Sequence, residues 1–208
     1  MDDLKFWGYE ILSAMIPFLI VLVLFRYIQK KKGVLYTRYS FVAVITMALY
    51  MVGVYHFTGA GTFYDGLTYQ LEWRQEQVNL IPFSYSIDVV AYLLNIVLFV
   101  PLGFLSPLVW EKMKKLPNLL AISFWFTLLI EVSQLLNNRR TDIDDILLNI
   151  LGAVVGFGLF QLFDKTTKSK LHVKNPITFE LMICVILTFL GRFFLYNEMG
   201  LAKIIYGF

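Results

Sequence analysis

Polar and charged side chains that could do chemistry gather between positions 131 and 149 of a largely apolar sequence. They are Glu131, Gln134, Arg139, Arg140, Asp142, Asp145 and Asn149. The first two lie one helical turn apart at the end of an apolar segment, and the last three have helical spacing at the start of the next. Two helices could therefore direct these groups toward one place, with both arginines in the turn between them. So many hydrogen-bonding groups at one depth require an explanation beyond packing.

Ligand binding is the first interpretation of this group. Arg139 or Arg140 would contact a phosphate or carboxylate, because a guanidinium offers an anion two parallel donors. The amide and carboxylate side chains below would bind further polar groups of the same ligand. They are Asn95, Glu131, Gln134, Asp145 and Asn149.

Acid–base catalysis is the second interpretation, with Glu131 and either Asp142 or Asp145 as candidate acid and base. The sequence has no His near this group and no evident Ser–His or Cys–His pair, which counts against an enzyme. A divalent cation held by these acids and Asp144 is conceivable, but the nearby arginines oppose it, so we predict no metal and no cofactor. The third interpretation is structural, with acids and arginines paired only to hold two helices together.

The composition places this group in a membrane. Of 208 residues, 58% are hydrophobic and 16% are charged, well below the charged share of soluble proteins. Segments long enough to cross a bilayer, roughly 20 residues, occur at about 11–28, 39–57, 88–110, 117–136, 144–163 and 177–196. The sequence therefore predicts an all-α, polytopic membrane helix bundle with about six transmembrane helices in a single domain spanning 1–208.

The distribution of Lys and Arg predicts how the bundle is oriented. Most of them lie in the connections 26–38, 112–115 and 165–174, which we expect to face the cytoplasm. Both termini and the turn with the two arginines would then be extracytoplasmic. The single cysteine, Cys184, lies in an apolar segment and is expected to pack in the core. Because the chain has no second cysteine, an intrachain disulfide is excluded.

Three polar residues in separate segments are expected at similar depths. Asn95 lies about two turns inside its helix, or about 10 Å, and Glu131 and Asn149 lie about one and a half turns inside theirs. We therefore expect Asn95, Glu131, Gln134, Asp145 and Asn149 to share one polar pocket in the outer half of the membrane.

Glycine and proline residues indicate how these helices pack. Pro101 and Gly103 should break or bend the helix that carries Asn95 and make room for a cavity. Gly152, Gly156 and Gly158 should allow another helix to approach closely.

The remaining polar residues give weaker signals. His56 is expected as a hydrogen-bonding residue at the interface, and Glu180 and Arg192 are close enough to the membrane surface to extend their charges into water. The long connection 58–87 contains Pro82, which restricts its backbone. That connection forms either a turn over the polar pocket or a simple loop on the helix ends.

Five ordered motifs resemble the VanZ-like family. They are NLIPF at 79–83, N-x5-PLGF at 95–104, E-x2-Q at 131–134, RRTDIDD at 139–145 and N-x2-G-x3-G at 149–156. The resemblance defines a core at 79–158 and adds Asn79 to the ligand-binding candidates. The family pattern falls on Asn79, Pro82, Phe83, Asn95, Pro101, Gly103, Glu131, Gln134, Arg140, Asp142, Asp145, Asn149, Gly152 and Gly156.

The resemblance implies a multi-pass protein of the bacterial cell membrane, associated with resistance to teicoplanin-type glycopeptides. Expected partners are membrane lipids, a lipid-linked envelope precursor or the lipoglycopeptide itself, and no nucleic acid. The polar site would face the extracytoplasmic side. The sequence leaves the oligomeric state open.

The first testable prediction concerns orientation. A cysteine introduced by Asn138→Cys should react with a membrane-impermeant thiol reagent in whole cells, whereas one introduced by Lys114→Cys should not. The reverse labelling pattern would place the polar group on the cytoplasmic side.

Overall fold

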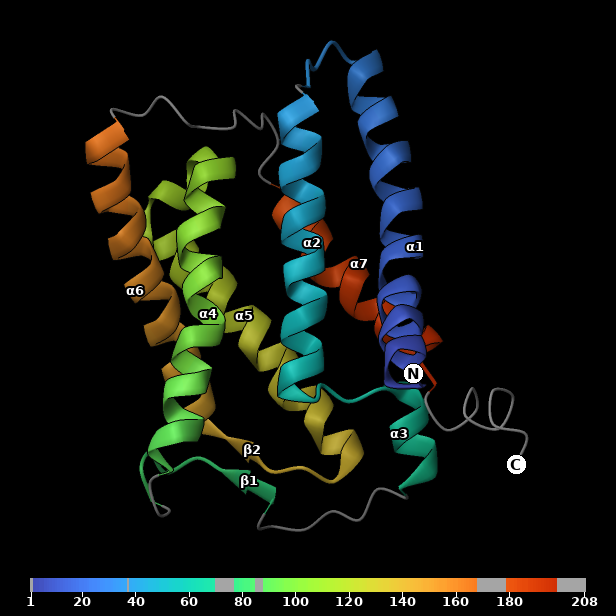
Figure 1. Ribbon diagram of the computed structural model, residues 1–208, viewed down its shortest axis with the longest axis vertical. Coiled ribbons are helices and arrows are strands. Elements are labelled where there is room, and N and C mark those ends of the chain that lie inside the picture. The colour runs from blue at the N-terminus through green and yellow to red at the C-terminus, as the bar shows by residue number, and fades with distance from the viewer. Residues whose placement is uncertain (1, 37, 70–76, 85–87, 168–178, 198–208) are drawn as a thin grey trace.

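The computed structural model describes residues 2–36, 38–69, 77–84, 88–167 and 179–197, which form mainly helices, with two short strands and the turns that connect them (Figure 1). The long helices are α1 (Asp2–Lys31), α2 (Arg38–Thr58), α4 (Val89–Val109), α5 (Leu116–Gln134), α6 (Ile143–Thr167) and α7 (Phe179–Leu195). The short elements are α3 (Phe63–Thr68), β1 (Val78–Asn79), β2 (Thr141–Asp142) and two 3-10 turns, Glu111–Lys114 and Leu135–Asn137. The predicted all-α class is confirmed.

Five of these helices are long and apolar enough to cross a membrane, namely α1, α2, α4, α5 and α6. The sixth predicted segment, at 177–196, corresponds to α7, which has 17 residues. At 1.5 Å per residue it is about 26 Å long, slightly short of a bilayer core of roughly 30 Å. The structure thus confirms a bundle of membrane helices, and the placement of the termini outside the cell stays a prediction.

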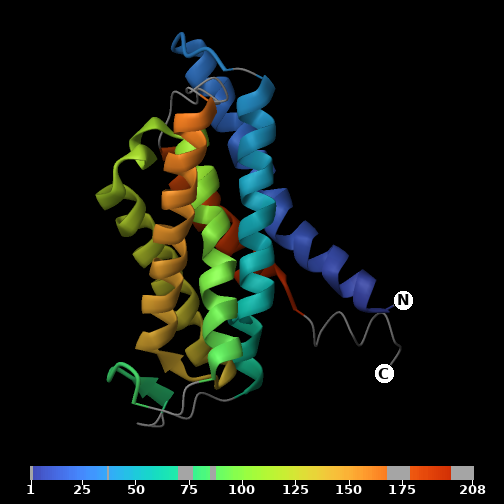
Figure 2. The same ribbon diagram turned by 60° about the vertical axis from the view of Figure 1, so that its left-hand side comes forward.

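The helices pack in pairs, and the bundle has two chemically different ends. α4 packs on α6, α1 on α7, and α5 on α6. The connection between α1 and α2 and the turn Glu111–Lys114 lie at one end, here called the basic end. β1, β2 and α3 lie at the opposite end, here called the polar end (Figures 1 and 2).

Glycines bring α4 and α6 into backbone contact. A Cβ atom added at Gly103, Gly152 or Gly156 would lie only 1.9–2.1 Å from a carbonyl oxygen of the facing helix. Small residues permit this approach, as predicted for Gly152 and Gly156. Gly158 has no atom within 4 Å of such a Cβ, so its predicted role in close packing is wrong.

The helix α4 does not break at its prolines. Pro101 and Pro107 lie inside one continuous helix, so of the predicted break or bend the break does not occur. Pro101 has no N–H group, so the carbonyl four residues earlier has no helical donor. The Tyr50 hydroxyl of α2 donates to the neighbouring carbonyl of Leu98 at 2.7 Å and so supplies a polar contact in this region.

Two buried ion pairs connect α1 to α7, one at each end. At the basic end Arg26 makes two hydrogen bonds to Glu180, at 2.9 and 3.1 Å. At the polar end Glu10 pairs with Arg192 at 2.6 Å. Glu180 and Arg192 are both buried, so the expectation that they extend into water is wrong. Cys184 is buried in the core of α7, as predicted.

The second prediction tests the contact between α4 and α6. Gly152→Ala should lower the free energy of unfolding by about 1–3 kcal/mol, because its methyl group would overlap the Ile96 carbonyl oxygen. Gly158→Ala on the same helix is the matched control and should be neutral or stabilising by up to about 1 kcal/mol through helix propensity. Thermal unfolding in detergent measures both, and equal melting temperatures would contradict the packing argument.

Candidate functional site

Two strands place the NLIPF segment beside the start of α6. β1 and β2 are parallel, with Val78 opposite Thr141 and Asn79 opposite Asp142. The Asn79 amide nitrogen donates to both carboxylate oxygens of Asp142, at 3.1 and 3.2 Å. This contact joins two residues that are 63 positions apart in the sequence.

The NLIPF turn is fixed to this pair by further hydrogen bonds. The Asn79 side-chain oxygen accepts from the backbone N–H of Ile81 and from the Ser84 hydroxyl, both at 3.1 Å. Phe83 has a φ of 55°, and its N–H donates to the carboxylate of Asp144 at 2.9 Å. The buried Asp144 also accepts from the Tyr92 hydroxyl at 2.6 Å. Within the 58–87 connection, the NLIPF part is a loop held against the starts of α4 and α6, whereas residues 63–68 form α3.

Glu131 connects α5 to the same strands. Its buried carboxylate accepts from the N–H of Asp142 at 3.1 Å, and its backbone carbonyl accepts from the Thr141 hydroxyl at 2.8 Å. Between α4 and α6, the Asn95 amide donates to Asp145. We call Glu131, Asp142, Asp144 and Asp145, with their donors, the carboxylate network.

Asn149 lies deeper and contacts a different residue. Its amide nitrogen donates to the Thr127 hydroxyl at 2.7 Å between α6 and α5, and the residue is buried. Its side-chain oxygen is buried and has no hydrogen-bond partner in the described part of the chain.

The turn between α5 and α6 reaches toward α2 instead of the carboxylate network. Gln134 and Arg139 both donate to the carbonyl of Thr58, each at 2.7 Å, and Asn137 donates to the carbonyl of Gly59 at 2.9 Å. The hydrogen bonds described for the Gln134 and Arg139 side chains therefore go to the end of α2, and none goes to the carboxylate network. Arg140 is exposed at the surface.

The turn that follows α2 borders a cavity of about 550 Å³. Its wall comes from α1, the end of α2, α3, the turn between α5 and α6, and the end of α7. The lining residues are Phe6, Trp7, Glu10, His56, Gly59, Ala60, Thr62, Tyr64, Asp65, Thr68, Tyr69, Asn137, Arg139, Arg192, Tyr196 and Asn197. We call this space the polar-end cavity.

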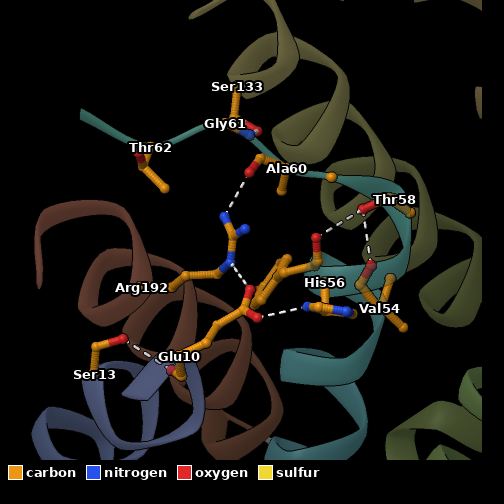
Figure 3. Close-up of polar contacts among 12 residues, drawn as sticks. Glu10, Ser13, Val54, His56, Thr58, Ala60, Gly61, Thr62, Ser133 and Arg192 are labelled. Carbon is orange, nitrogen blue, oxygen red and sulfur yellow. Dashed lines mark hydrogen bonds and ion pairs between the residues drawn. The ribbon is translucent and has the colours of Figure 1, made fainter. Parts of the chain in front are cut away.

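A buried acid organises one side of this cavity, as Figure 3 shows. One carboxylate oxygen of Glu10 accepts from Arg192 at 2.6 Å, and the other contacts Nδ1 of His56 at 2.6 Å. Arg192 also donates to the carbonyl of Ala60. Three elements distant in sequence, α1, α2 and α7, thus meet at one carboxylate.

Sequence reasoning did not assign Glu10, Arg192 or Tyr92 to a site, and it considered Asp144 only as a conceivable cation ligand. One signal was present: the first and last long helices each carry an acid toward the start and an arginine toward the end, in the same order. The order Glu10 then Arg26 on α1 and Glu180 then Arg192 on α7 is what two antiparallel helices need to form two ion pairs. Tyr92 and Asp144 gave no such pattern.

The carboxylates of the network already accept hydrogen bonds from protein donors. Asp142 bonds Asn79, Asp144 bonds Tyr92 and Phe83, and Asp145 bonds Asn95. Within the described residues, no three His, Cys, Asp or Glu side chains are grouped so that they could hold a metal ion. The arrangement is suited to bracing, whereas the polar-end cavity has space for a ligand.

Comparison with known proteins gives a family match. A family model described as VanZ/LLP1 matches residues 41–164 of the 208, which spans most of α2 through nearly all of α6. α1 and α7 lie outside the matched range. No curated protein and no solved structure matches the chain.

The third prediction tests the pairing of the two strands. Asn79→Asp keeps the acceptor oxygen but replaces the donor by a second acid facing Asp142, and it should cost about 1–3 kcal/mol of stability. The double variant Asn79→Asp, Asp142→Asn exchanges the partners and should recover most of this loss.

Asn118→Asp is the control for the exchange, because it removes a single amide donor, to the Lys112 carbonyl, near the protein surface. It should have a smaller effect on the melting temperature in detergent. A double variant as unstable as the sum of its single variants would show that Asn79 and Asp142 are not coupled.

Proposed function

Since the chain belongs to the VanZ/LLP1 family, we propose that it is an envelope membrane protein that binds the head of an amphiphile with an anionic group at its polar end. The observation that carries this proposal is the polar-end cavity, whose wall contains Arg139, an arginine with no ion pair among the described residues. An arginine at such a place offers a planar pair of donors to a phosphate or carboxylate.

The surroundings of the cavity favour an amphiphile over a small soluble anion. Large apolar side chains lie beside it: Phe63 and Phe194 are exposed, Phe193 is partly buried, and the three rings contact one another where α3 meets the end of α7. In membrane proteins, aromatic rings are enriched near the boundary between headgroups and acyl chains. Phospholipids, lipid-linked wall precursors and lipoglycopeptides all combine a polar head with an apolar part.

The basic end supports the proposed orientation. Lys30 and Lys31 end α1 and Lys32 follows it, and the turn Glu111–Lys114 with Lys115 adds further basic residues at the same end. Because cytoplasmic connections are enriched in Lys and Arg, the polar end would face the outside of a bacterial cell. There it would meet both envelope precursors and glycopeptides of the teicoplanin type.

Bracing is the role that the contacts favour for the carboxylate network. Glu131, Asp142 and Asp145 each accept a bond from a donor on another element, so each of these acids already links two parts of the fold. A hydrogen bond to a charged group stabilises by roughly 1.5–3 kcal/mol. The network would therefore hold α4, α5 and α6 while the cavity beside it binds the ligand.

The fourth prediction tests binding at Arg139. Arg139→Gln should weaken binding of dihexanoyl phosphatidylglycerol to the purified protein about tenfold, the loss expected for one charged hydrogen bond. Cells that express this variant should also lose protection against teicoplanin. The melting temperature without lipid should change little, because Arg139 is exposed.

Arg38→Gln is the charge-matched control, since Arg38 is exposed and begins α2 at the basic end. It should bind lipid and protect cells like the unchanged protein. If a stable Arg139→Gln variant also did both, the proposed site would be wrong.

A further inference from the structure

The charged groups of the polar-end cavity fall into two pairs of opposite sign. Glu10 and Arg192 contact each other directly and are both buried, so their charges largely cancel. Arg139 and Asp65 line the same cavity, but in the described part of the chain neither forms an ion pair with a residue of opposite charge.

Backbone contacts hold Arg139 and Asp65 in place. Arg139 donates to the Thr58 carbonyl, and its guanidinium occupies the space where a Cβ on Gly59 would lie. The Asp65 carboxylate accepts from the N–H of Thr62 at 2.7 Å, as part of the capping box of α3. Both partners are neutral, so neither bond cancels the charge of Arg139 or Asp65, and both charges lie in one cavity. Arg139 also interacts electrostatically with Glu131 and Asp145, which do not line the cavity.

This pair of charges restricts the kind of head that fits. A purely anionic head attracted by Arg139 would meet the negative charge of Asp65 in the same cavity. A head that also carries an ammonium group would satisfy both residues. Two tyrosines also line the cavity, Tyr64 beside Asp65 in sequence and Tyr69 four residues after it, and they add ring faces of the kind that bind cations.

We propose that the polar-end cavity binds a zwitterionic headgroup, with its phosphate or carboxylate at Arg139 and its primary ammonium group at Asp65. This inference rests on the proposed function and specifies its ligand. Glu10 is a positioning residue in this arrangement, because it holds Arg192 and His56 in the wall (Figure 3).

Short-chain lipids that differ only in the head test the assignment. The purified full chain in detergent is titrated with dihexanoyl phosphatidylethanolamine or dihexanoyl phosphatidylglycerol, and the rise in melting temperature gives the apparent affinity. The ethanolamine lipid should bind about tenfold more tightly, as expected for one added charged contact. O-phosphoethanolamine, which has the same head without acyl chains, should bind at least about tenfold more weakly than the lipid.

Asp65→Asn tests the role of the negative charge alone, because asparagine removes the charge but keeps an oxygen that can accept from the N–H of Thr62. This variant should lose the preference for ethanolamine and bind the glycerol lipid at least as well as before. Asp88→Asn is the matched control: Asp88 also caps a helix at the polar end, the start of α4, but does not line the cavity. It should retain the preference.

The outcomes separate this inference from the proposed function. If Asp65→Asn keeps the preference, or the unchanged protein binds both lipids equally, the zwitterionic assignment is wrong while lipid binding stands. If neither lipid raises the melting temperature, both proposals fail. Binding of O-phosphoethanolamine as tight as that of the lipid would overturn the requirement for an amphiphile.

Discussion

The backbone contact between α4 and α6 is the constraint on which the polar end depends. Three glycines, Gly103, Gly152 and Gly156, leave no room for a Cβ between the helices. Because the helices touch, short side chains can bridge them farther along the same seam, and Asn95 reaches Asp145. A wider separation would move the start of α6 away from α4 and leave these polar groups without partners, which is costly where water is scarce.

A second junction forms where α2 ends. The last carbonyls of a helix have no donor within it, and here side chains from other elements supply the donors. Gln134 and Arg139 bond the Thr58 carbonyl, and Arg192 bonds that of Ala60. Gln134 and Arg139 lie within the family-matched range, whereas Arg192 lies in α7, outside that range. Both parts of the chain therefore donate hydrogen bonds to the turn that follows α2. The cavity lies at this meeting point, so both parts of the chain form its wall.

The amino-acid sequence was sufficient to predict the elements but not all of their partners. Hydropathy located every long helix, and the glycine spacing located the seam at Gly152 and Gly156, because both depend on local composition. The sequence also placed Gln134 with Glu131, one turn apart on α5. Residues one turn apart share a face only approximately, and in the structure Gln134 bonds Thr58 while Glu131 bonds Asp142. Which neighbour each side chain meets depends on helix tilt and rotation, which no local pattern encodes.

The two groups of charged residues at the polar end differ in their hydrogen-bond partners and in whether they line a cavity. In the carboxylate network, amide, hydroxyl and backbone donors reach the acids, so these residues hold helices together. In the cavity, Arg139 and Asp65 bond backbone groups that carry no compensating charge. The wall opposite them belongs partly to α1 and α7. Substitutions in these two outer helices could therefore change which head the cavity accepts without disturbing the glycine seam or the network that supports it.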